Sequence, residues 1–163
     1  MDDLWLGLRL LLLLAVANSA PIAAKRLLGD RWSAPLDGAL RFVDGRPLLG
    51  SSKTVRGFVA AVVASAVAAL PLGLPVGVGA ALGALAMLGD ALSSFTKRRL
   101  DIAPSGRATG IDQIPEALLP LLGLQAALGL SLLQIAAITL AFFVLEIPLA
   151  RLVYRLGLRD RPY

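Results

Sequence analysis

Residues 74–95 read LPVGVGAALGALAMLGDALSSF, an apolar run interrupted by one charged side chain, Asp90. About 20 consecutive apolar residues are enough for a helix to cross the hydrocarbon core of a bilayer. Four further apolar blocks lie at residues 4–24, 58–73, 114–134 and 135–156. We therefore predict an all-α, polytopic transmembrane helix bundle of about five helices, forming one integral membrane domain over residues 1–163.

The composition of the whole chain also favours a membrane protein. Hydrophobic residues make up 57% of the sequence and charged residues 17%, and the mean hydropathy is +0.77. The second block is short, because Pro71, Gly73 and Pro75 mark its exit. The last two blocks meet at Gly129 and Ser131, where we expect a hairpin, since about forty apolar residues exceed what one span can use.

Basic residues collect in segments that five spans would place on one side of the membrane. They are Lys25, Arg26, Arg31, Arg41, Arg46, Lys53 and Arg56 in the loop 25–57, Lys97, Arg98, Arg99 and Arg107 in the loop 96–113, and Arg151, Arg155, Arg159 and Arg161 at the end of the chain. The positive-inside rule makes this side cytoplasmic in a cell membrane, with the N-terminus outside and the C-terminus inside. We expect no nucleic-acid partner, because these residues flank apolar spans and do not line an aromatic groove.

Asp90 is the most informative polar residue. An aspartate in the middle of a membrane helix costs about 3 kcal/mol, so an interaction must offset that cost. Ser93, Ser94 and Lys97 follow at helical spacing and share one face with Asp90. This stripe is suited to a metal-binding carboxylate followed by a phosphate-binding amine. The alternative is a buried aspartate paired with an arginine for helix packing.

Asp112 and Glu116 lie one turn apart at the entry to the fourth block. Two carboxylates at this spacing repel each other, and a shared Mg²⁺ would remove the repulsion. The chain contains no cysteine and no histidine, so metal ligands must be oxygen atoms. The competing interpretation is that Asp112 is an N-cap and Glu116 interacts with the helix dipole.

The first loop ends in GSSKTVRG, residues 50–57. Its small residues would let backbone N–H groups approach an anion, which Lys53 and Arg56 could neutralise. It does not match a Walker A loop, and a solvated loop is the alternative. Asn18 near the end of the first block would contact substrate or staple helices together, and the sequence does not separate these roles.

Four ordered motifs together resemble the CDP-archaeol synthase family of membrane cytidylyltransferases, which is related to CDP-diacylglycerol synthase. They are the segment ANSAP at 17–21, DG at 44–45 with GSSKTVRG, GD at 89–90 with SSFTKRR at 93–99, and DQ at 112–113. The resemblance implies transfer of CMP from CTP to the phosphate of a membrane glycerolipid, with release of pyrophosphate. Val55 and the segment 113–120 depart from the family pattern, so the lipid stays open between archaeol-type ether and diacyl forms.

The resemblance also implies roles for individual residues. Catalytic roles fall to Asp90, Asp112, Lys53 and Lys97, and Mg²⁺ ligation falls to Asp90, Asp112 and Glu116. Substrate contacts are predicted for Asn18, Ser52, Thr54, Arg56, Ser93, Ser94, Arg98 and Arg99. The partners would be CTP, a membrane lipid phosphate and the bilayer itself, and a homodimer is one option for the assembly.

Two other functions compete with this hypothesis. A small transporter would use the intramembrane acids Asp90 and Glu146 as an ion pathway, although no internal repeat supports paired halves. A non-catalytic membrane subunit would leave the gathering of Asp90, Asp112 and Lys97 on one face unexplained.

Overall fold

The computed structural model describes residues 2–103, 106, 108 and 110–155. The regular elements of this part are α1 (Asp2–Leu28), α2 (Val55–Ala69), α3 (Val76–Arg99), α4 (Gln113–Gly123), α5 (Gln125–Leu128) and α6 (Leu132–Arg155). The predicted all-α class is therefore confirmed. Of the predicted cytoplasmic basic residues, Arg107, Arg159 and Arg161 lie outside the described residues.

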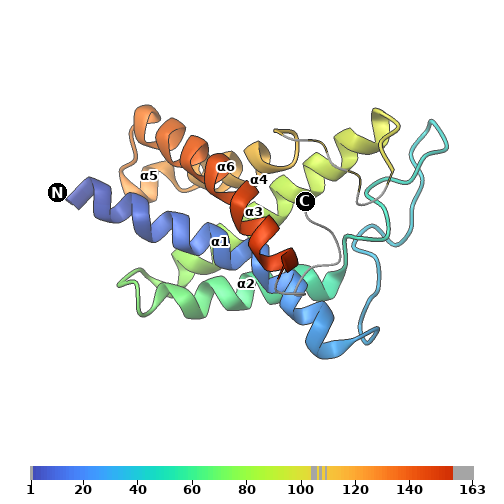
Figure 1. Ribbon diagram of the computed structural model, residues 1–163, viewed down its shortest axis with the longest axis horizontal. Helices are drawn as coiled ribbons and strands as arrows, with labels where there is room; N and C mark the ends of the chain where they lie inside the picture. Colours follow the sequence, from blue (N-terminus) through green and yellow to red (C-terminus); the bar gives the residue numbers. More distant parts are fainter. Residues whose placement is uncertain (1, 104–105, 107, 109, 156–163) are drawn as a thin grey trace.

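Two helices are long and apolar enough to cross a membrane, over Asp3–Leu28 and Val76–Arg99. Two shorter apolar helices, Val55–Ala69 and Leu132–Glu146, accompany them in the described part of the chain. The N-terminus, the turn between α2 and α3, and α5 lie at one end of the bundle, whereas the long loop between α1 and α2 lies at the other (Figure 1).

The fourth apolar block differs from its prediction. A single helix over 114–134 was expected, but the helix ends at Gly123 and a separate short helix, α5, ends at Leu128. Gly129 then adopts a left-handed conformation with φ 65°, which favours glycine. The apolar composition alone carries no signal for this break.

Local capping explains where two helices begin. Thr54 accepts a hydrogen bond from the Gly57 backbone N–H at 3.2 Å, so α2 begins at Val55, three residues before the predicted block. At α6, the Gln134 N–H donates to Ser131 Oγ while the Ser131 N–H donates to Gln134 Oε1. This reciprocal capping box begins the helix at Leu132, ahead of the predicted residue 135.

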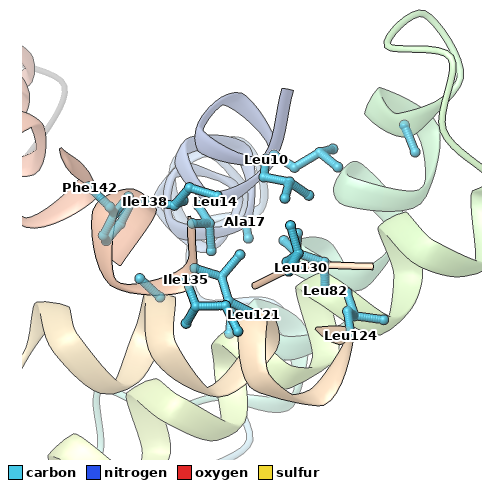
Figure 2. Packing of buried hydrophobic residues seen from close by; sticks show 14 residues of the cluster. Leu10, Leu14, Ala17, Leu82, Leu121, Leu124, Leu130, Ile135, Ile138 and Phe142 are labelled. Atoms are coloured by element: carbon cyan, nitrogen blue, oxygen red, sulfur yellow. The ribbon is translucent and has the colours of Figure 1, made fainter. Parts of the chain in front are cut away.

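Small residues let α2 and α3 approach each other closely. A Cβ added to Gly83 would lie 2.7 Å from the Ala61 carbonyl oxygen, and one added to Gly79 would lie 2.7 Å from the Ala69 Cβ. Small residues at such spacing are typical of helix pairs in membranes. Side chains of α1, α3, α4 and α6 meet in the hydrophobic core, including Leu14, Leu82, Leu121 and Phe142 (Figure 2).

The first loop is held in a defined shape by the buried side chain of Asp37. Its carboxylate accepts hydrogen bonds from the backbone N–H groups of Ala39, Leu49 and Gly50. Burial alone would raise the pKa of Asp37, but these backbone donors outweigh it and hold the pKa below its ordinary value. The loop then returns to the bundle at Lys53, whose carbonyl oxygen accepts from the Leu36 N–H at 2.8 Å.

Candidate active site

The end of the first loop delivers Lys53 to the carboxylate of Asp90 on α3. Lys53 Nζ donates to Asp90 Oδ1 at 2.6 Å and also contacts Oδ2. Both side chains retain 20% exposure. The interaction that offsets the cost of an aspartate in α3 is therefore a lysine from a loop 37 residues away. Asp90 therefore pairs with a lysine, and not with the arginine of the predicted alternative.

A second lysine–carboxylate pair lies seven residues further along α3. Lys97 Nζ forms an ion pair with Asp112 Oδ1, and the side-chain exposures are 9% and 22%. Asp112 Oδ2 also accepts a hydrogen bond from the Ala108 N–H at 3.0 Å. Asp112 occupies the N-cap position of α4, but its side chain makes no capping hydrogen bond. Its carboxylate is thus held by Lys97 and the preceding turn.

Glu116 on α4 lies beside Asp90 on α3, and each side chain affects the electrostatics of the other. Gly89 makes this approach possible, because an added Cβ would lie 2.9 Å from the Glu116 Cα and closer still to the Pro115 backbone. Within the described residues, no group of three His, Cys, Asp or Glu side chains is close enough to hold one metal ion. Of the three predicted Mg²⁺ ligands, the structure brings Asp90 and Glu116 together and pairs Asp112 with Lys97.

Arg56 and Thr54, both predicted to contact substrate, bond to the protein itself. Arg56 Nη1 donates to the carbonyl oxygens of Gly29 at 2.6 Å and Arg31 at 2.7 Å, and the residue is 9% exposed. These bonds tie the chain after α1 to the start of α2. Thr54 is the N-cap described above.

Arg98 and Arg99 bond to different parts of the chain, and each has a buried Nε without a hydrogen-bond partner among the described residues. Arg99 Nη2 donates to the Pro47 carbonyl oxygen at 2.7 Å, and its Nη1 lies 3.1 Å from Asp44 Oδ1, so it fastens the first loop. Arg98 is 4% exposed and donates to the Ala103 carbonyl oxygen at 3.0 Å. Its Nε and Nη1 are buried and have no hydrogen-bond partner in the described part of the chain. Arg98 therefore keeps donors for an anion.

The small polar side chains that were predicted to contact substrate differ in their burial and in their partners. Ser93 Oγ donates back to the Gly89 carbonyl oxygen at 2.9 Å and lies 3.4 Å from the Asp112 carbonyl oxygen. Ser94 is buried and Ser52 is exposed. Asn18 Nδ2 is buried without a hydrogen-bond partner among the described residues.

Gln113 and Glu146 received no defined place in the sequence prediction of the site. The Gln113 amide donates from Nε2 to Glu146 Oε2 at 2.9 Å and accepts from the Gly110 N–H at 2.8 Å. Glu146 is the acid that the transporter hypothesis used. A polar residue directly after Asp112 in an apolar helix was the available signal, but its pairing with Glu146 on α6 has no signature in the sequence.

Comparison with known proteins identifies the family and the fold of the chain. The family model of CarS-like CDP-archaeol synthases matches residues 69–163. The chain belongs to this family. The matched range includes Asp90, Lys97 and Asp112, whereas Lys53 comes from the loop that precedes it.

Individual members of the CDP-archaeol synthase family agree with this assignment. The CDP-archaeol synthase of Sulfurisphaera tokodaii is 36% identical over 135 residues, covering 79% of this chain and 81% of the relative. That of Thermofilum pendens is 37% identical over 155 residues, covering 91% and 76%. A solved structure described as an intramembrane enzyme for archaeal membrane lipid biosynthesis matches with a TM-score of 0.69 and 31% identity, covering 86% of this chain and 89% of that one.

These findings confirm the predicted resemblance and the membrane helix bundle. They also give the reaction class, which is that of the CTP-dependent cytidylyltransferases acting on a lipid phosphate. The transporter alternative finds no support among them.

Proposed function

We propose that this protein transfers CMP from CTP to the phosphate of an archaeol-type ether lipid in the membrane. The observation that carries the proposal is the presence of two lysine–carboxylate pairs, Lys53–Asp90 and Lys97–Asp112, at one end of a membrane bundle. The choice of lipid rests on the similarity to CDP-archaeol synthases.

The reaction requires little covalent chemistry from the protein. An oxygen of the lipid phosphate attacks the α-phosphorus of CTP, a new phosphoanhydride bond forms, and the bond between the α- and β-phosphates breaks to release pyrophosphate. The attacking phosphate is already ionised, so no strong general base is needed. Positioning and positive charge around the phosphates are then the main contributions.

The residues of the site divide these tasks. Lys53, Lys97 and the buried Arg98 would hold the phosphates of CTP and the lipid. Asp90 and Glu116 would hold Mg²⁺, because this ion is commonly bound by one or two carboxylates together with substrate phosphates. When bound, Mg²⁺ would neutralise charge that develops on the phosphate oxygens.

Asp112 would orient Lys97 toward the phosphates, in keeping with their ion pair. If Asp112 were also a Mg²⁺ ligand, the Asp112→Asn variant would need more Mg²⁺ for activity.

We place this site at the cytoplasmic face of the cell membrane, with the N-terminus outside. The support is the concentration of basic residues in the loops at that end of the bundle. CTP would enter from the cytoplasm while the lipid tails stay in the bilayer.

The experiment is a conversion assay on protein purified in detergent, with Mg²⁺, CTP and a panel of archaeol-type ether phosphates and diacyl phosphatidic acids. We expect CDP-lipid formation with a higher kcat/KM for the ether series. The Asp101→Asn variant is a matched control, because it removes an exposed carboxylate that lies 3.5 Å from Arg46 Nη2 and belongs to neither lysine–carboxylate pair. No pyrophosphate from any lipid would overturn the proposed function, and a preference for diacyl lipids would overturn the lipid assignment alone.

A further inference from the structure

Gln113 connects two parts of the molecule that are far apart in sequence. It lies at the first position of α4 and is 9% exposed. Its Oε1 accepts from the Gly110 N–H in the preceding turn, and its Nε2 donates to Glu146 Oε2 on α6. The side chain therefore joins the turn before α4 to a helix 33 residues further along the chain.

The two partners fix the orientation of the Gln113 amide. The Gly110 N–H can only donate and Glu146 Oε2 serves as the acceptor, so a flipped amide would lose both hydrogen bonds. A buried amide with both groups bonded has one favoured arrangement. Glu146 thereby sets which way Gln113 faces.

The turn held by Gln113 is the one that carries Asp112. The Asp112 N–H donates to the Ala108 carbonyl oxygen at 3.0 Å, and Asp112 Oδ2 accepts from the Ala108 N–H at 3.0 Å. The Gly110 carbonyl oxygen accepts from the Ile114 N–H. Gly110 and Asp112 thus belong to one hydrogen-bonded unit, and Gln113 anchors that unit to α6.

We infer that Glu146 is a positioning residue, which acts through Gln113 to hold the turn that places Asp112 against Lys97. This inference rests on the proposed function, in which Lys97 holds substrate phosphate. Glu146 touches neither substrate nor metal in this role. It supplies from α6 the acceptor that keeps the turn in place.

An exchange of the two side chains tests the inference. Gln113→Glu alone brings two carboxylates together and removes the donor to Glu146. Glu146→Gln alone keeps an oxygen that can accept from Gln113. The double variant Gln113→Glu/Glu146→Gln restores both bonds of residue 113, because Glu at 113 can accept from the Gly110 N–H and from the Gln amide at 146.

We expect Gln113→Glu to lower kcat/KM for CTP by about 10- to 100-fold, the range found for residues that orient ligating groups. The double variant should regain at least about tenfold of that loss. The KM for CTP should rise more than the KM for the lipid phosphate. General misfolding would raise both KM values, so the comparison separates the two explanations. Gln113→Asn, whose amide is too short to reach both partners, gives a neutral variant should Gln113→Glu fail to fold.

Gln134→Glu is the matched control, since Gln134 bonds to Ser131 at the opposite end of the bundle. It adds the same charge and should leave kcat/KM for CTP unchanged. A double variant no more active than Gln113→Glu, or equal rises in both KM values, would overturn the inference.

Binding of CTP with Mg²⁺, measured by calorimetry on the same proteins, separates this inference from the proposed function. Wild-type protein that converts no lipid would overturn the proposed function. The positioning role then stands if affinity falls in Gln113→Glu and returns in the double variant, and is overturned if all variants bind equally.

Discussion

At the scale of single residues, the site depends on carboxylates that each hold a lysine. Asp90 would be costly in a membrane helix without such a partner, and Lys53 supplies it from the first loop. Removing one member of a partly buried ion pair leaves the other without compensation. Substitution of these acids should therefore affect chemistry and local charge together.

Asp90→Asn should lower kcat by at least about 100-fold, a loss typical for removal of a group that organises transition-state charge. The variant should also need more Mg²⁺ for half-maximal activity, because Asp90 is a proposed ligand. The measurement is a Mg²⁺ titration of initial rates, with thermal unfolding in detergent to show that the protein is folded. Wild-type turnover in Asp90→Asn would refute the metal assignment.

Asp112→Asn should lower kcat/KM for CTP by about 100-fold, mainly by raising the KM for CTP through Lys97. Initial rates at varied CTP give this KM, and the Mg²⁺ titration gives the metal requirement of the same variant. An increased Mg²⁺ requirement equal to that of Asp90→Asn would return Asp112 to the set of metal ligands.

Asp37 should make the first loop sensitive to acid. Its pKa is lowered in the folded protein relative to 3.8, so its stabilising contribution is present above that value and is lost as the pH falls through the folded pKa. The Leu49 amide donates to Asp37, so its hydrogen exchange should be strongly protected at neutral pH. At low pH the protection, measured against the intrinsic exchange rate at the same pH, should decrease. An Asp37→Asn variant with the same pH dependence would contradict this assignment.

The sequence allowed the main acids and lysines to be predicted, but not their pairing. Asp90 was identifiable because its burial in an apolar run needs compensation. Glu146 was equally visible, yet its bond to Gln113 depends on the packing of α6 against α4. Arg56 and Arg99 were predicted to bind substrate, but the structure shows them bonded to backbone carbonyl oxygens and to Asp44. The spacing of basic residues in the sequence does not reveal such partners.

At the scale of helices, glycine determines how α3 meets its neighbours. Gly89 lies directly before Asp90 and against the backbone of α4 at Pro115. The distance between the two helices sets whether Glu116 can reach Asp90. The close approach of α3 and α4 is thus part of the site.

Gly89→Ala should separate α3 from α4 and lower the free energy of unfolding by about 1–3 kcal/mol, the usual cost of overpacking. Activity should fall with it. Gly77→Ala on the same helix is the matched control, since nothing lies within 4 Å of its added Cβ. Equal stability of the two variants in chemical unfolding would contradict the packing argument.

Helix ends could be predicted only where a side chain caps them. The Ser131 and Gln134 pair was a readable signal for the start of α6. The break between α4 and α5 was not readable, because it falls at Leu124, where no side chain caps either helix.

At the scale of the whole molecule, the distribution of basic residues and the direction of the helices predict the same orientation in the membrane. The loop between α1 and α2 and the turn between α5 and α6 lie at opposite ends of the bundle (Figure 1), and Ser131 belongs to that turn. The basic loop should therefore face the cytoplasm and Ser131 the outside.

Single cysteines test this orientation cleanly, because the natural chain contains none. Ser131→Cys should react with a membrane-impermeant maleimide in intact cells, whereas Ser51→Cys should react only after the membrane is permeabilised. The reverse pattern would invert the topology and place the site outside.

The central claim is nucleotidyl transfer to a lipid phosphate, and position-specific labelling of CTP tests it most directly. With the purified wild-type protein, Mg²⁺ and an archaeol-type ether phosphate, phosphorus label at the α-position of CTP should appear in the lipid product. Label at the γ-position should appear in pyrophosphate in equal amount. Transfer of the γ-label to the lipid, or no transfer from the α-position, would contradict the account.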